Sequence, residues 1–170
     1  DFMSVLHKST KRDYLARVND LDFPKAKAAE LAKQWGYEYW DGDRRVNYGG
    51  YSYIGGRWEK VAKAMAEHYK LPKNPKILDV GCGTGFNLTM LGRFGCVYGI
   101  DISQEAANYC QKRGYQIVTS NVMSMPFSEN SFDVVTSLGV FYHKNVKDDL
   151  QGMREIFRVL KPNGKVLTLT

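Results

Sequence analysis

From residue 76 onward the chain alternates short apolar runs with amphipathic segments, and this order constrains its fold more than any other feature. The apolar runs have the length of strands and lie at 76–81, 96–101, 116–120, 131–138 and 165–170. Helical patterns separate most of them, one ending near residue 93 and others covering 103–113 and 147–160. Strands joined through helices lie parallel, because the helix returns the chain to the same edge of the sheet. The sequence therefore predicts an α/β fold with a doubly wound, mainly parallel sheet flanked by helices.

Residues 1–75 differ in composition and in hydrophobic pattern. Two helices are predicted there, from Pro24 to about Trp35 and from about Arg57 to Tyr69. Between them, eight of the 24 residues in 35–58 are Trp or Tyr, interleaved with glycines. Such a segment is too rich in glycine for an ordinary core element and too aromatic for an idle linker.

These differences predict two parts, an N-terminal helical and aromatic segment over 1–56 and a core domain over 57–170. No apolar run approaches the roughly 18–20 residues that cross a bilayer, and the N-terminus lacks the pattern of a signal peptide. The three cysteines are too few and wrongly spaced for a disulfide framework or a zinc site. We therefore expect a cytoplasmic protein with no metal and no membrane partner.

The net charge of +6 lies mainly in the front half, where residues 1–76 hold 15 Lys and Arg against 10 Asp and Glu. A basic surface can attract nucleic acid. Here the charges alternate in sign and form no block, which favours solvated helix faces. A nucleic-acid partner stays open as the less favoured alternative.

The candidate chemistry is concentrated in Asp79-Val80-Gly81-Cys82-Gly83-Thr84-Gly85, directly after the first predicted strand. Alternating glycines let the main chain approach a ligand closely, and the helix that follows offers unpaired N–H groups. Asp101 ends the second predicted strand, where a carboxylate can accept hydrogen bonds from both hydroxyls of a ribose. Together these features predict a cofactor of the adenosine type.

Two residues argue against a dinucleotide. The dehydrogenase pattern would need glycine at position 86, where this chain has Phe86, and Asp79 is unfavourable beside a pyrophosphate. An acid there suits a ligand with a positive centre and an ammonium group. S-adenosyl-L-methionine (SAM) carries both, so a NAD-dependent oxidoreductase is disfavoured.

The runs ILDVGCGTG, GIDIS and MPFSENSFDVVTSLGVFYH resemble the successive motifs of the class I SAM-dependent methyltransferases, especially the small-molecule type, over residues 54–170. The resemblance implies a Rossmann-like sheet and a SAM site. In that site Asp101 would hold the ribose, Ile102 would pack on adenine, and the main chain of Leu138 would meet the amino group. The residues that would bind the cofactor are Asp79, Gly81, Cys82, Gly83, Thr84, Gly85, Asp101, Ile102, Asn121, Val122 and Leu138.

Two of these residues, Asn121 and Val122, would meet the adenine. Where the family usually carries an acid that reaches the adenine amine, this chain has Asn121, whose side-chain oxygen can still accept from that amine. Val122 would offer its main-chain N–H to the adenine ring. We therefore expect weakened rather than lost binding of adenine.

His143 lies just past the fourth predicted strand and is the candidate general base. A purely structural role, in which the histidine caps the loop, is an equally favoured alternative. Tyr142 beside it could donate a hydrogen bond or form a wall of the pocket. In the resembling enzymes the stretch ahead of the first strand covers SAM. We therefore expect residues 37–58 to form a lid, with Tyr51, Tyr53 and Arg57 as candidate contacts to cofactor or substrate.

The resulting hypothesis is a methyltransferase that moves a methyl group from SAM to a small molecule, such as a sugar or a natural-product intermediate. An RNA-modifying methyltransferase and a non-catalytic SAM-binding module are the alternatives. The family's sheet has seven strands, whereas this chain stops in the fifth. Its apolar edge at Val166, Leu167 and Leu169 therefore predicts a fragment, or a homo-oligomer that covers the edge.

Overall fold

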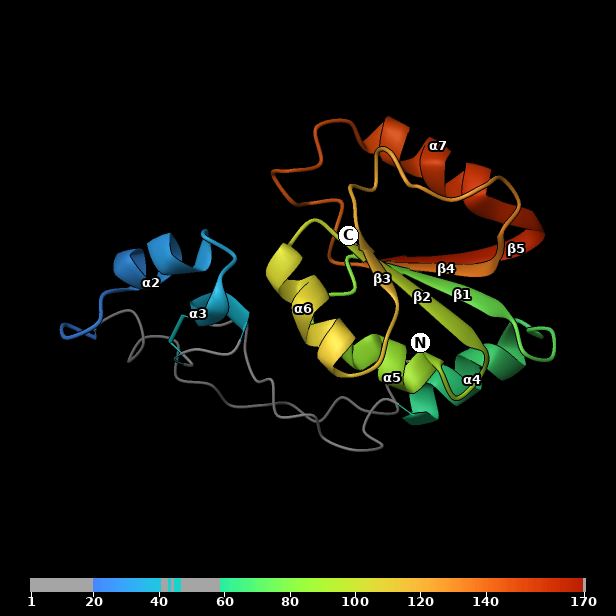
Figure 1. Cartoon of the computed structure of the whole chain (residues 1–170), viewed down its shortest axis with the longest axis horizontal. Helices are drawn as coiled ribbons and strands as arrows, with labels where there is room; N and C mark the ends of the chain where they lie inside the picture. Colours follow the sequence, from blue (N-terminus) through green and yellow to red (C-terminus); the bar gives the residue numbers. More distant parts are fainter. Residues whose placement is uncertain (1–19, 41–42, 44, 47–58, 170) are drawn as a thin grey trace. The chain divides into compact units, whose positions relative to one another are not determined.

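The computed structural model describes residues 20–40, 43, 45–46 and 59–169 (Figure 1). The chain divides into two compact units, with the division after Arg57. None of the described helices is long and apolar enough to cross a membrane.

The second unit is built on a five-stranded parallel sheet, as the sequence predicts (Figure 1). Its strands are β1 (Lys76–Val80), β2 (Cys96–Asp101), β3 (Ile117–Thr119), β4 (Phe132–Leu138) and β5 (Leu160–Leu169). Their order in the sheet is β3-β2-β1-β4-β5. The order reverses between β1 and β4, and ligands of such sheets bind where this happens, at the carboxyl ends of the strands.

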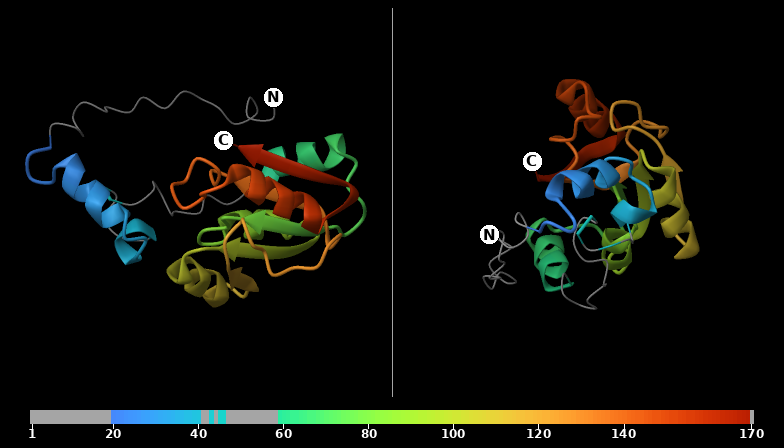
Figure 2. Two further views of the ribbon diagram at one scale, coloured as in Figure 1. Left: turned by 90° about the horizontal axis from the view of Figure 1, so that it is seen from above. Right: turned by 90° about the vertical axis from the view of Figure 1, so that its left-hand side faces the viewer.

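Helices cover both faces of the sheet (Figures 1 and 2). They are α4 (Glu59–His68), α5 (Phe86–Leu91), α6 (Gln104–Lys112) and α7 (Asp149–Val159). Side chains of β1 alternate between the two faces, so Leu78 and Val80 pack in one core cluster with Ile156 of α7. On the opposite face, α5 and α6 enclose a smaller cluster that contains Leu88 and Cys110. The prediction of a doubly wound α/β fold is confirmed.

Side-chain caps fix where two helices begin. Ser103 Oγ accepts from Ala106 N–H at 3.2 Å at the start of α6, and Asp148 Oδ1 accepts from Gln151 N–H at 2.9 Å at the start of α7. The predicted N-cap at Ser103 is confirmed. For α7 the cap moves the start from the predicted 147 to Asp149.

The helices are shorter than predicted and β5 is longer. The helix expected to reach Trp35 ends at Ala32. The helix expected to reach residue 93 ends at Leu91, and hydrogen-bonded turns follow it. The strand expected from 165 begins at Leu160, because Leu160 already pairs with Phe132 of β4. An irregularity between these pairings absorbs Pro162, which cannot donate to a ladder.

The described part of the first unit holds α2 (Lys25–Ala32) and α3 (Tyr37–Trp40), the latter inside the segment that we expected to be a lid. Trp40 is 6% exposed, and its ring N–H donates to Trp35 O at 2.9 Å. Trp40 therefore anchors the packing of this unit.

Candidate functional site

The turn between β1 and α5 holds three glycines in conformations that other residues rarely adopt. Gly81, Gly83 and Gly85 have φ values of 71°, 53° and 84°. The N–H groups of Gly81 and Cys82 both donate to Ile100 O, at 2.8 and 3.0 Å, which ties the turn to the end of β2. The result is a cradle of main chain at the carboxyl ends of the two strands.

Asp101 holds this cradle in place from the end of β2. Its Oδ2 accepts from Gly83 N–H and its Oδ1 from Ser103 N–H, both at 2.9 Å. Burial raises the pKa of Asp101, and these main-chain hydrogen bonds oppose the rise. Each carboxylate oxygen can accept a further hydrogen bond, so the side chain is able to take two hydroxyl groups while it keeps the turn.

Asp79 is the buried acid of the site. It is 1% exposed in β1, and its Oδ1 accepts from Thr136 Oγ1 at 2.6 Å across the β1–β4 register. Burial raises the pKa of Asp79 to about 7, although the hydrogen bond from Thr136 opposes the rise. A nearby cation would stabilise the charged carboxylate, so this acid is suited to an ammonium group.

Buried polar atoms test whether these residues fit SAM. Among the described residues, Thr84 Oγ1 and Ser137 Oγ are buried with no hydrogen-bond partner in the protein, and Asp79 Oδ2 has at most the nearby Asn87 side chain, which with Thr136 opposes the rise in the pKa of Asp79. Thr84 belongs to the cradle, and Ser137 lies one residue before the carboxyl end of β4. Because buried polar groups are normally paired, this set indicates a polar ligand at this edge. The ammonium and hydroxyl groups of SAM can pair with these oxygens, whereas a pyrophosphate would be repelled by Asp79.

The residues expected at adenine follow β2 and β3. Ile102 is 43% exposed directly after Asp101, which leaves its side chain available to a ring. Asn121 Oδ1 accepts from Met123 N–H at 3.0 Å, so the turn orients this oxygen and one lone pair remains. Val122 is 3% exposed with its side chain in the core, so only its main chain could meet a ligand.

The loop after β4 forms a second wall. Leu138 ends the strand with 37% of its surface exposed, and Tyr142 is 64% exposed. Val140 lies so close to Gly81 that a Cβ on this glycine would collide with it. The cradle therefore needs glycine at position 81 because two segments approach each other there.

His143 lies in the same loop and is half-buried. Its Nδ1 accepts from Asn145 N–H at 3.3 Å, so the neutral ring carries its proton on Nε2. Burial, helped by Lys144, lowers the pKa of His143, while the charge of Asp101 opposes this shift. The imidazole is therefore neutral at pH 7 and lies within electrostatic reach of Asp101.

Cys82 and Cys110 lie behind the cradle. Cys110 Sγ donates to Gly83 O at 3.2 Å, and a hydrogen bond between the two thiols, together with burial, raises the pKa of Cys82. A thiol that stays protonated is a poor nucleophile, so Cys82 serves the shape of the turn.

Tyr51, Tyr53 and Arg57 lie outside the described residues. The structure adds Thr136 and Val140, which the sequence analysis missed. A polar residue inside the apolar run 131–138 was the available signal for Thr136, whereas the approach of Val140 to Gly81 has no local signal. Among the described residues, no group of three or more His, Cys, Asp or Glu could hold a metal ion.

Comparisons with known proteins place this chain in a family. Residues 78–168 match the family described as a methyltransferase domain. A demethylmenaquinone methyltransferase of Anoxybacillus flavithermus is 38% identical over 118 residues, which are 63% of this chain and 49% of that protein. A tRNA (carboxymethyluridine(34)-5-O)-methyltransferase of Xenopus tropicalis is 30% identical over 111 residues, 65% of this chain and 17% of that protein.

The crystal structure of the PH0226 protein from Pyrococcus horikoshii OT3 matches with a TM-score of 0.58 and 25% identity. The match covers 82% of this chain and 64% of that one. The chain spans about half the length of the demethylmenaquinone methyltransferase that it matches. With the family match and the fold in agreement, the chain belongs to the class I SAM-dependent methyltransferases.

Proposed function

We propose that the chain transfers a methyl group from SAM to a small-molecule acceptor. The main-chain cradle at Gly81, Gly83 and Gly85, with Asp79 and Asp101 beside it, is the observation that carries the proposal. It offers a carboxylate for a ribose and a second, buried carboxyl for an ammonium group. Membership of the methyltransferase family supports the transfer of a methyl group.

The cofactor would supply a methyl group that its positive sulfur already activates. The protein residues would bind and orient. Asp101 would accept from the ribose hydroxyls, Ile102 would pack on the base, and the main chain of Leu138 would meet the amino group. Because the displacement is in line, alignment and exclusion of water are then the main contributions to rate.

We assign to His143 the removal of a proton from an oxygen or nitrogen acceptor. Burial favours the neutral imidazole, which can accept a proton. The hydrogen bond from Asn145 N–H to Nδ1 is long, at 3.3 Å, so Nδ1 can give it up and take the proton of the acceptor instead. His143→Ala and His143→Gln should both lower turnover by about 100-fold or more, with little change in affinity for S-adenosylhomocysteine. Full activity in His143→Gln, which keeps a hydrogen-bond donor but no base, would contradict the assignment.

The similar proteins narrow the choice of methyl acceptor to be tested first. Several matching proteins are named demethylmenaquinone methyltransferases, which supports a quinone-type small molecule as the first acceptor to be tested. Sugars come second in the screen. Intact cofactor binding without transfer to any acceptor, in the longest form of the protein, would favour a non-catalytic SAM-binding module.

The deciding experiment is calorimetric titration of the chain with S-adenosylhomocysteine, with NAD in parallel. We expect binding of the first alone. Asp101→Ala should weaken it by about 1–3 kcal/mol, because two charge-assisted hydrogen bonds to the ribose are lost. Binding of NAD, or an unchanged affinity in Asp101→Ala, would contradict the proposed site.

A tRNA acceptor is the second candidate, supported by the tRNA methyltransferase that matches at 30% identity. It predicts RNA binding whose affinity falls steeply between 50 and 200 mM salt, since Lys and Arg would displace counterions from phosphates. Absent or salt-insensitive RNA binding would remove this candidate.

A further inference from the structure

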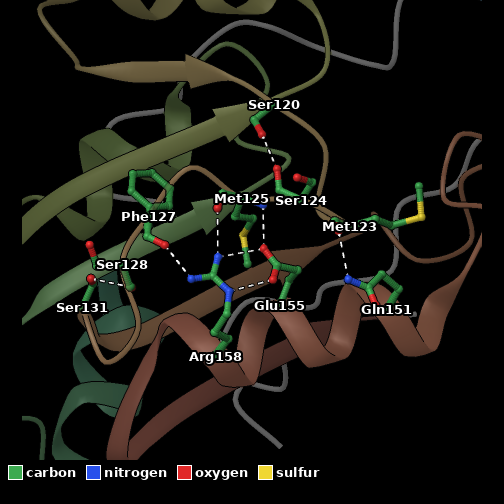
Figure 3. Close-up of polar contacts among 10 residues, drawn as sticks. All are labelled: Ser120, Met123, Ser124, Met125, Phe127, Ser128, Ser131, Gln151, Glu155 and Arg158. Atoms are coloured by element: carbon green, nitrogen blue, oxygen red, sulfur yellow. Dashed lines mark hydrogen bonds and ion pairs between the residues drawn. The ribbon is translucent and has the colours of Figure 1, made fainter.

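The loop 120–131, which connects β3 and β4, is bound over its middle part by side chains of α7 (Figure 3). The loop carries Asn121 and Val122 at its start. In the first turn of α7, Gln151 Nε2 donates to Met123 O at 3.3 Å. The hold on the loop therefore begins beside the residues expected at adenine.

The main contact is a clamp, formed by Glu155 and Arg158, on Met125. Glu155 Oε2 accepts from Met125 N–H at 2.7 Å, and Arg158 Nη2 donates to Met125 O at 2.9 Å (Figure 3). Arg158 Nη1 also donates to Phe127 O at 2.6 Å. Met125 is 5% exposed, so its main-chain groups depend on these partners rather than on water.

The clamp is rigid because its two members bind each other. Arg158 Nε lies 2.7 Å from Glu155 Oε1, and Nη2 lies 2.8 Å from Oε2. The side chains are 29% and 13% exposed, so water screens the pair only partly. The bond from Arg158 holds the pKa of Glu155 below its usual value, so the pair stays charged at neutral pH. The planar guanidinium fork reaches a carboxylate and two carbonyl groups at once, which a lysine could not do.

The carbonyl groups that α7 binds belong to alternate residues, Met123, Met125 and Phe127. All three carbonyl groups accept from side chains of α7, so α7 fixes one side of the loop at three points. The fixed side reaches Asn121, because Asn121 Oδ1 accepts from Met123 N–H. On the far side, Ser120 Oγ donates to Ser124 O at 2.8 Å and closes the turn.

We propose that Glu155 and Arg158 are positioning residues for the adenine of the cofactor: by fixing the main chain at Met125 they set where Asn121 and Val122 meet the base. The proposal rests on the proposed function, since it needs SAM in the cradle. Neither side chain touches the cofactor. Loss of the clamp should therefore affect recognition of the base more than recognition of the ribose and the amino acid.

The test compares S-adenosylhomocysteine with S-inosylhomocysteine, which differ only in the base. The N–H of Val122 can donate to the bare N1 of adenine, whereas hypoxanthine carries a hydrogen there, so the unsubstituted chain should prefer the adenosine compound. Arg158→Ala should weaken binding of S-adenosylhomocysteine by about tenfold and bring the two affinities close together. The exposed Arg154, on the same helix, supplies the matched control, and Arg154→Ala should change neither affinity.

Arg158→Lys and Glu155→Gln each keep part of the clamp, so they serve as tests if Arg158→Ala fails to fold. Both should show a preference for S-adenosylhomocysteine that is intermediate between those of the unsubstituted chain and Arg158→Ala. A variant that binds more weakly but keeps the full preference for adenine would overturn the positioning role, because a merely structural effect weakens both ligands equally. If the unsubstituted chain binds neither compound, the proposed function fails and this assignment fails with it. The two failures are thus distinguishable.

Discussion

Asp79 is buried in the sheet with a pKa raised to about 7, whereas an unfolded Asp has a pKa of about 3.9. Between about pH 4 and pH 7 the folded chain therefore keeps a proton that the unfolded chain has released, so the free energy of unfolding falls as the pH rises. Asn cannot ionise. Asp79→Asn should therefore stabilise the chain by about 2 kcal/mol more at pH 8 than at pH 5, measured by urea unfolding. An equal effect at both pH values would show that Asp79 does not titrate in this range.

The same carboxyl should make cofactor binding depend on pH. Affinity for S-adenosylhomocysteine should rise by up to about tenfold from pH 6 to pH 8, as Asp79 ionises beside the ammonium group of the ligand. Asp79→Asn should bind more weakly and lose this rise. Because the pKa of Asp101 is also raised, a rise that persists in Asp79→Asn would assign the dependence to Asp101 instead.

Among the elements, α7 shows how packing can reverse a helix propensity. Gly152 lies inside the helix, where Ala is ordinarily better by about 1 kcal/mol. A Cβ at this position would lie 2.9 Å from the ring of Phe141 and 3.4 Å from Val122, both buried. Gly152→Ala should therefore lower the free energy of unfolding by about 1 kcal/mol or more, measured in urea. Leu150→Ala, at an exposed position of the same helix, is the control, and a stabilised Gly152→Ala would contradict the packing argument.

The same elements show what the sequence could and could not predict. The five strands and α6 follow from local patterns, because short apolar runs and the Ser103 cap are short-range signals. The start of β5 does not, since it depends on the pairing of Leu160 with Phe132, 28 residues earlier. In the site, the glycines and Asp101 could be predicted from their spacing along the sequence. Thr136 stands out locally as a polar residue in an apolar run, but its bond to Asp79 depends on the β1–β4 register. The clamp of Arg158 on the loop crosses 31–33 residues and has no local signal.

In the molecule as a whole, β5 is the outer strand of the described sheet, and Leu169 is 64% exposed at its end. Leu169 O accepts from Gly139 N–H, so the main-chain groups of Leu169 face inward. Because these groups alternate along a strand, those of Thr168 face outward and could pair with a second copy. We expect sedimentation velocity to show concentration-dependent association of this chain. Thr168→Pro removes an outward N–H donor at an edge that tolerates proline, so it should reduce association and leave the fold intact. Thr168→Ser keeps this donor and should leave the association unchanged. Association that survives Thr168→Pro would place the contact elsewhere on the molecule.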